Sequence, residues 1–167
     1  MKRITGILLI AISAASFGTL AIFGRFLYTE GLDTFTLLYL RFSVAALVMA
    51  LILILHREAF PRGKILLQLI GMGAIGYAGQ AFSFLSAIKY ASAGLVALLL
   101  YLYPMFVFML SVIVLREKVT WIKIGAITLA LIGTALTVDP AGGQLLGILL
   151  AISSALIYSV YIIVGTN

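Results

Sequence analysis

The chain has 167 residues, 64% of them hydrophobic and 10% charged, with a net charge of +6 and no Cys. Soluble domains carry about a quarter charged residues, so this composition excludes a soluble globular protein. Long unbroken apolar runs exclude a transmembrane β-barrel, whose strands alternate polar and apolar residues. The absence of Cys excludes disulfides and thiolate catalysis. The remaining class is an all-α polytopic membrane protein.

Charged and turn-forming residues divide the chain into six apolar stretches. Each is close to the length of about 20 residues that a helix needs to cross about 30 Å of hydrocarbon. The connections between the stretches are short and polar, and none is long enough to form a separate domain. We therefore predict six transmembrane helices, at residues 4–27, 35–55, 65–88, 92–115, 121–138 and 145–164.

The first stretch also has the outline of a secretory signal. Lys2 and Arg3 precede an apolar segment, and the small residues from Ser13 to Ala15 would form its cleavage site. The apolar run continues as far as Leu27, which is long enough to span the membrane and favours a retained helix.

The positive charges gather on one side of this predicted topology. With the amino terminus inside the cell, eight of the eleven Lys and Arg residues fall in cytoplasmic segments, which agrees with the positive-inside rule. We therefore expect a multi-pass protein of a bacterial or archaeal-type plasma or inner membrane, with both ends in the cytoplasm. Because the orientation of the chain in the lipid bilayer accounts for its excess of positive charge, no nucleic-acid partner is expected. The eight residues are Lys2, Arg3, Arg57, Arg62, Lys64, Arg116, Lys118 and Lys123.

The sixth stretch resembles the first when the sequence is shifted by 141 positions. Residues 6–9 and 147–150 are both Gly-Ile-Leu-Leu, and each stretch then carries two small residues four positions apart. Small residues at this spacing form a face suited to close packing of helices. A chance resemblance between two apolar helices is the alternative. The aligned small residues are Ala14 and Gly18 in the first stretch, and Ala155 and Ser159 in the sixth.

If the sixth stretch is the first helix of a second copy, each copy of the repeat contains five helices. Because five is odd, the two copies would cross the membrane in opposite directions. Inverted repeats are typical of alternating-access transporters, which hold their substrate near the midplane between the repeats. We expect a complete repeat at residues 4–138 and the first helix of a truncated second repeat at residues 145–167. Four further helices, or another copy of the chain, would complete the arrangement.

Residues 80–120 resemble the EamA-like transporters of the drug/metabolite transporter superfamily. The shared features are the run AIKYASA at residues 87–93, Pro104 within the fourth stretch, and Glu117 just before a Val-Thr turn. The resemblance implies ten helices in two inverted five-helix repeats that move small organic metabolites or drugs, commonly outward. In that family, helices 1 to 4 of each repeat are expected around the cavity, and the fifth is peripheral.

Arg41 is the only charged residue well inside a predicted stretch, because Arg25 and Lys123 lie two residues from the ends of theirs. A charge near the middle of a bilayer costs about 2.5–3.5 kcal/mol on insertion scales, so such a residue usually has a function. One interpretation is that Arg41 binds an anionic group, such as a substrate carboxylate, or forms a pair that holds one access state closed. The other is that its long side chain reaches out to the nearby headgroups.

Gly76, Gln80 and Ser83 in the third stretch share one helical face, because they are separated by four and three residues. With Gly79 they present polar groups and accessible backbone in one direction. Gln80 and Ser83 are therefore candidate substrate-binding residues, and the two glycines would shape a cavity. Close helix packing with a hydrogen bond from the Gln80 side chain is the alternative.

Pro104 lies near the middle of the fourth stretch, where it cannot donate a hydrogen bond to the Leu100 carbonyl. The resulting kink would shape a cavity wall or act as a hinge. Tyr101, one turn earlier on nearly the same face, is a candidate for stacking on a substrate. A role of Tyr101 in packing alone is the alternative.

The acidic residues all lie between the stretches, so no embedded carboxylate is present for a proton relay. No arrangement typical of an enzyme, a metal site or a cofactor site is evident, and we expect none of the three. Transmembrane transport of small organic solutes by alternating access, in the direction of export, is the leading hypothesis. The alternative is a non-transporting assembly or accessory protein, or a fragment that needs further helices. The acids are Glu30, Asp33, Glu58, Glu117 and Asp139.

Overall fold

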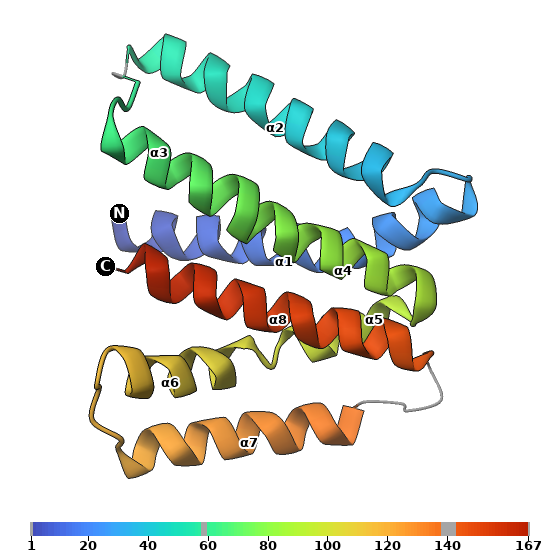
Figure 1. Cartoon of the computed structure of the whole chain (residues 1–167), viewed down its shortest axis with the longest axis vertical. Coiled ribbons are helices and arrows are strands. Elements are labelled where there is room, and N and C mark those ends of the chain that lie inside the picture. The colour runs from blue at the N-terminus through green and yellow to red at the C-terminus, as the bar shows by residue number, and fades with distance from the viewer. Residues whose placement is uncertain (1, 58–59, 138–142, 167) are drawn as a thin grey trace.

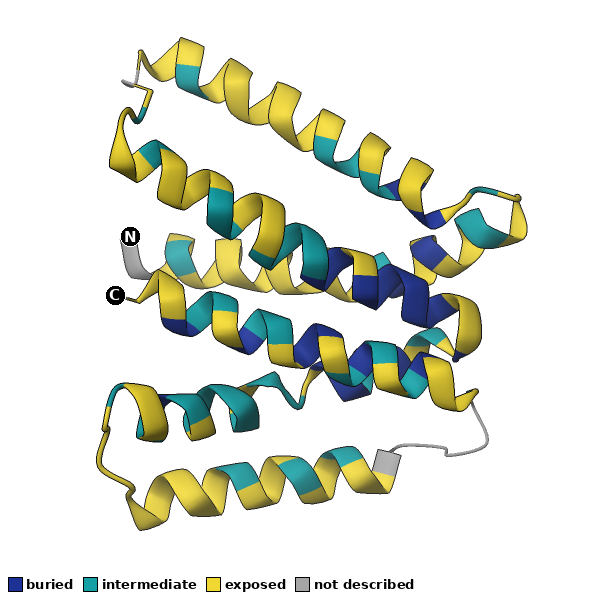
Figure 2. Ribbon diagram, viewed as in Figure 1, coloured by how far each residue is buried: buried dark blue, intermediate teal, exposed yellow. Residues whose placement is uncertain are grey.

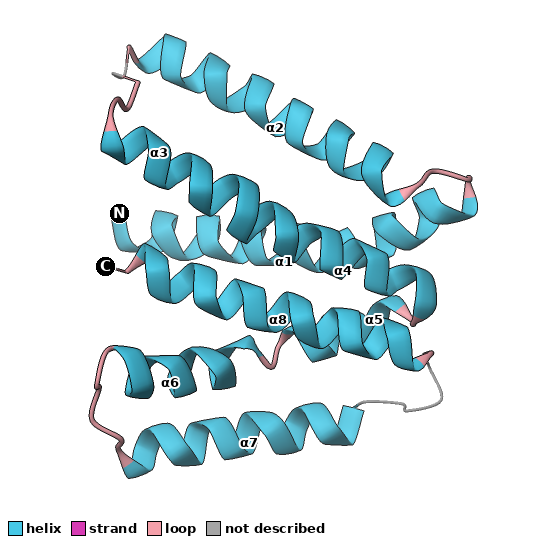
Figure 3. Cartoon of the chain, viewed as in Figure 1, coloured by secondary structure: helices cyan, strands magenta, loops and turns pink. Residues whose placement is uncertain are grey.

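The computed structural model describes residues 2–57, 60–137 and 143–166, and within them it contains helices and no strand (Figure 3). Two of the acids predicted to lie in loops, Glu58 and Asp139, fall outside the described residues. The helices are α1 Lys2–Thr29, α2 Thr34–His56, α3 Lys64–Gly71, the π-helix η1 Met72–Tyr77, α4 Ala78–Tyr90, α5 Ala93–Leu100, α6 Tyr103–Val114, α7 Trp121–Thr137 and α8 Leu145–Gly165.

These helices confirm the predicted all-α polytopic fold. In the described residues, five helical segments are long and apolar enough to cross a membrane. One of them joins α3, η1 and α4 without a break, and another joins α5 and α6. The fifth predicted helix differs, because its apolar part covers only Trp121–Leu136 and reaches about 24 Å at 1.5 Å per residue. It is therefore a shorter helix than the other five.

The helices run back and forth between two ends of the molecule (Figure 1). The start of α1 and the end of α8 lie at one end, together with the end of α2, the start of α3 and the connection at residues 115–120; we name this the terminal end. The connections at residues 30–33 and 91–92 lie at the opposite end. The first and last helices, α1 and α8, consequently run in opposite directions.

The core of the structure lies where α8 runs antiparallel to α4, with α5 and α6 also packed on α8 (Figure 2). Small side chains allow this close approach. A Cβ on Gly147 would stand 2.9 Å from the Ala91 Cβ, so no larger residue fits at that point. Ala151, Ala155 and Ser159 continue the same face of α8 and are fully buried.

The first half of α1 is exposed, in contrast to α8. Ala14 and Gly18 are exposed, and a Cβ on Gly18 would meet no atom within 4 Å. Near its end, α1 approaches the core: Ala21 is buried and a Cβ on Gly24 would lie 3.3 Å from the Leu85 side chain. The two helices matched by the 141-residue shift are therefore packed differently in the described structure.

Candidate functional site

The membrane-embedded charge of Arg41 is held by aromatic side chains. Its Nη2 donates a hydrogen bond of 2.7 Å to the Tyr77 hydroxyl. The guanidinium carbon lies 5.6 Å from the centre of the Tyr77 ring and 5.9 Å from that of Phe42, distances at which a ring attracts a cation. Within the described residues no carboxylate forms an ion pair with Arg41. Its other N–H groups therefore remain able to bind an anion.

Five aromatic rings form a continuous row from α2 to α6, which we name the aromatic row. Arg41 lies at its α2 end. Successive ring centres are 6.1, 6.0, 6.1 and 5.0 Å apart, within the range of favourable aromatic contacts. In order the row consists of Phe42 on α2, Tyr77 at the end of η1, Tyr161 and Tyr158 on α8, and Tyr103 at the start of α6.

A largely apolar groove of about 850 Å³ lies beside the aromatic row, between α3 with η1 and the second half of α8. Pockets of about 300–1,000 Å³ are typical for small organic ligands. Tyr161 belongs both to the groove and to the row, so the two form one region. The residues that mark the extent of the groove are Ile65, Gln68, Met72, Gly76, Tyr161 and Gly165.

Gly76 permits the close contact between η1 and α8. A Cβ on Gly76 would stand 2.9 Å from a ring carbon of Tyr161, closer than real Cβ contacts allow. A Cβ on Gly79, by contrast, would meet nothing within 4 Å. The π-helix that contains Gly76 inserts one residue per turn relative to an α-helix, and such insertions are frequent at functional sites. Of the two predicted glycines, Gly76 therefore borders the groove directly.

Gln80 and Ser83 are buried, and their polar atoms bind within the protein. The Gln80 Nε2 donates to the Ser154 hydroxyl at 3.0 Å, and that hydroxyl donates back to the Gln80 carbonyl at 3.1 Å. The Ser83 hydroxyl donates to the Gly79 carbonyl at 3.0 Å. In this conformation Gln80 joins α4 to α8. A role for either residue in substrate binding stays a prediction.

The fourth span tightens to a turn at Tyr101–Leu102, just before Pro104. Tyr101 still donates to the Ala97 carbonyl at 3.2 Å, whereas Leu102 donates to the Leu99 carbonyl only three residues back. Pro104 sits in the first turn of α6, where its missing N–H costs nothing. Tyr101 is 59% exposed. Tyr103 instead joins the aromatic row, and its carbonyl accepts a 3.1 Å hydrogen bond from Ser159.

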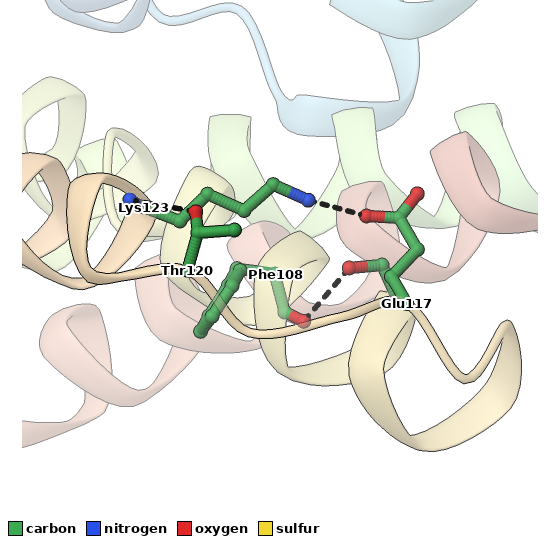
Figure 4. Close-up of polar contacts among 5 residues, drawn as sticks. Phe108, Glu117, Thr120 and Lys123 are labelled. Atoms are coloured by element: carbon green, nitrogen blue, oxygen red, sulfur yellow. Dashed lines mark hydrogen bonds and ion pairs between the residues drawn. The ribbon is translucent and has the colours of Figure 1, made fainter.

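The Glu117 turn at the terminal end is organised by polar contacts (Figure 4). The Glu117 carboxylate lies 2.7 Å from the Lys123 ammonium, with both side chains nearly half exposed. The Thr120 hydroxyl accepts a hydrogen bond from the Lys123 amide and so caps the start of α7. These contacts fix the connection from α6 to α7, which contributes no residue to the aromatic row.

Sequence reasoning missed four tyrosines of the aromatic row: Tyr77, Tyr103, Tyr158 and Tyr161. Tyrosines of membrane proteins concentrate at the interfaces with water, so a tyrosine near the middle of an apolar stretch is itself a signal. Tyr158 and Tyr161 also lie three residues apart, on the same side of α8. Their contacts with Tyr77 and Tyr103 depend on the packing of distant helices.

Comparison with known proteins gives the same class of protein. The sequence pattern of the EamA-like transporter family matches residues 4–139. A curated relative from Archaeoglobus fulgidus, named as an uncharacterized transporter, is 29% identical over 128 residues, or 77% of this chain. The match covers 46% of that relative, so the chain spans less than half of its length. No solved structure matches the chain significantly. Because the family pattern covers most of the sequence, the chain belongs to the EamA-like transporter family.

Proposed function

We propose that the protein exports small organic anions across the membrane by alternating access. The observation that carries the proposal is the pairing of Arg41 with Tyr77 at 2.7 Å inside the membrane-spanning bundle. A charge within a membrane span and without a carboxylate partner among the described residues is costly, so its retention is best explained by a ligand of opposite charge. The aromatic row and the adjoining groove would hold the organic part of the solute.

The proposed mechanism needs a second repeat, and α8 supports this requirement. Its small face, including Ala155 and Ser159, is buried against helices of the first repeat. The matching face of α1, with Ala14 and Gly18, is uncovered in the described structure. We propose that a helix of an inverted second repeat packs on that face of α1 as α4 packs on α8. The substrate site would then lie between the repeats.

We also propose that the terminal end faces the cytoplasm, since the Lys and Arg residues are concentrated there. The groove reaches Ile65 and Gly165 at the same end, so it would receive a solute from inside the cell. Because the protein contains no Cys, single Cys residues can report the orientation. A reagent that cannot cross the membrane should label Glu30→Cys in intact cells and leave Arg62→Cys unlabelled. Labelling of Arg62→Cys alone would reverse the proposed orientation.

Transport itself can be tested in cells that express the protein and are loaded with a panel of organic acids. Release of at least one acid should be faster than in cells with an empty vector, and it should saturate with the internal concentration. The accessory-protein alternative predicts a different result. In that case no solute would move faster, and the protein would co-purify with a stable partner.

A further inference from the structure

A second pocket, separate from the aromatic row, lies at the opposite end of the molecule. It has a volume of about 440 Å³ and forms where the end of α1, the connection at residues 30–33 and the end of α4 meet. Arg25 and Lys89 both line it. They are the only two basic residues predicted at this end, so the exceptions to the charge asymmetry converge on one pocket.

The Arg25 guanidinium is fixed at the end of α4. Its Nη1 donates to the carbonyls of Ile88 and Ala91 at 3.0 and 3.4 Å, which satisfies acceptors left free where the helix ends. Nε and Nη2 have no acceptor among the described residues. The N–H groups on these two nitrogens are therefore available donors on a planar group that is held in place. This geometry suits a phosphate or another oxyanion.

The Lys89 ammonium is positioned by Tyr28, whose ring centre lies 5.0 Å away. The Tyr28 ring is itself anchored, because its hydroxyl donates to the Leu85 carbonyl at 2.9 Å and lies 3.0 Å from the Thr34 hydroxyl. Lys89 forms no ion pair within the described part of the chain. The contact with the Tyr28 ring therefore positions the Lys89 ammonium, and its three N–H donors are available to bind a ligand.

Asp33 is the one acid in the lining, and its carboxylate is engaged elsewhere. It accepts a 3.2 Å hydrogen bond from the Thr36 amide and caps the start of α2. This hydrogen bond holds the pKa of Asp33 below its usual value, so the carboxylate is ionised at neutral pH. Two basic residues and one acid leave the pocket with a net charge of +1.

We propose that this pocket binds a phosphate group through Arg25 and Lys89. The phosphate could belong to the headgroup of a membrane lipid or to a soluble phosphate ester, since both present the same oxyanion. The site is independent of the proposed transport site, because it lies at the other end of α4 and shares no residue with the aromatic row or the groove.

A fluorophore at the pocket tests this proposal with a local signal. Thr29 lines the pocket, is exposed, and bonds only to the Phe26 carbonyl, so Thr29→Cys can carry an environment-sensitive dye. In lipid-free detergent, titration with glycerol 3-phosphate should give a saturable change, and glycerol should give none. Lys89→Gln should weaken binding about fivefold and Arg25→Gln/Lys89→Gln about tenfold or more, because charged hydrogen bonds are lost. The Lys89 side chain forms no hydrogen bond to any described residue, so Lys89→Gln separates binding from folding.

The matched control is Lys64→Gln/Lys118→Gln, which removes two exposed charges at the terminal end and should leave the titration unchanged. Equal affinity in Lys89→Gln and the unsubstituted protein, or no saturable response, would overturn the proposal. Discs of phosphatidylglycerol and of a neutral glycolipid distinguish the two sources of phosphate. A response to glycerol 3-phosphate only in the glycolipid discs identifies a lipid headgroup as the occupant, and a response in both identifies a soluble ester.

Discussion

Replacing Arg41 with Gln is expected to reduce solute efflux about tenfold or more. The substitution keeps a side chain that can bond to Tyr77 but removes the charge, so an anionic solute loses a charged hydrogen bond inside the bilayer. Arg41→Lys keeps the charge and loses the planar fork, and it should transport at an intermediate rate. Initial efflux rates at equal amounts of protein in the membrane measure both effects.

Tyrosine variants provide controls for this prediction. Tyr77→Phe removes the hydroxyl that accepts from Arg41 and keeps the ring of the aromatic row, so it should slow efflux less than Arg41→Gln does. Tyr39→Phe makes the same change on α2 at a side chain that is 72% exposed, and it should have no effect. Unchanged efflux in both Arg41→Gln and Arg41→Lys would remove Arg41 from the transport site.

Replacing Ala155 with Leu is expected to separate α8 from the helices that pack on it. Ala155 is 0% exposed, and the neighbouring Ser154 is bonded to Gln80 across the same interface. A larger side chain at a closely packed position costs about 1–3 kcal/mol, since the helices must move apart. The loss of stability should appear as a lower midpoint in thermal or denaturant unfolding of the detergent-purified protein.

The repeat-related position offers the matched control. Ala14→Leu makes the identical change on α1, where the side chain is exposed, and it should change the stability of the 167-residue chain by about 0.5 kcal/mol or less. If Ala155→Leu is as stable as Ala14→Leu, the α4–α8 contact does not form the core of the protein.

The positions of the spans could be predicted closely from the sequence. Apolar length and charged ends depend on local composition, so α2 at Thr34–His56 and α8 at Leu145–Gly165 differ from the predicted ranges by one residue at most ends. α7 also begins at the predicted residue, Trp121, and reaches Thr137, the last described residue before the gap at 138–142.

The details inside the spans depend on contacts that local sequence does not contain. Pro104 indicated a disturbance of the fourth span, and the structure has a tight turn at Tyr101–Leu102, just before it. Tyr101, the residue predicted to stack on a substrate, is exposed, whereas Tyr103 lies in the aromatic row. In the third span the sequence predicted one helix at residues 65–88, and the structure has the π-helix η1 at Met72–Tyr77 within it.

The candidate site could be predicted only in part. Arg41 is conspicuous because it is the one charge away from the ends of an apolar stretch. Its partner Tyr77 is 36 positions away, and the next ring, Tyr161, is on a helix that belongs to the proposed second repeat. Gln80 has the spacing of a cavity residue, yet its amide is bonded to Ser154. The difference between a cavity-lining and a packing residue lies in the neighbouring helix.

Solute flux into proteoliposomes that contain only the purified protein tests most directly whether it is a transporter. The expected result is saturable uptake or counterflow of at least one small organic anion, which Arg41→Gln lowers about tenfold or more while Tyr39→Phe does not. Reconstitution without other proteins removes any partner from the assay. Wild-type flux no greater than that of protein-free vesicles, for every anion in the panel, would contradict the proposal that this protein moves organic anions by itself.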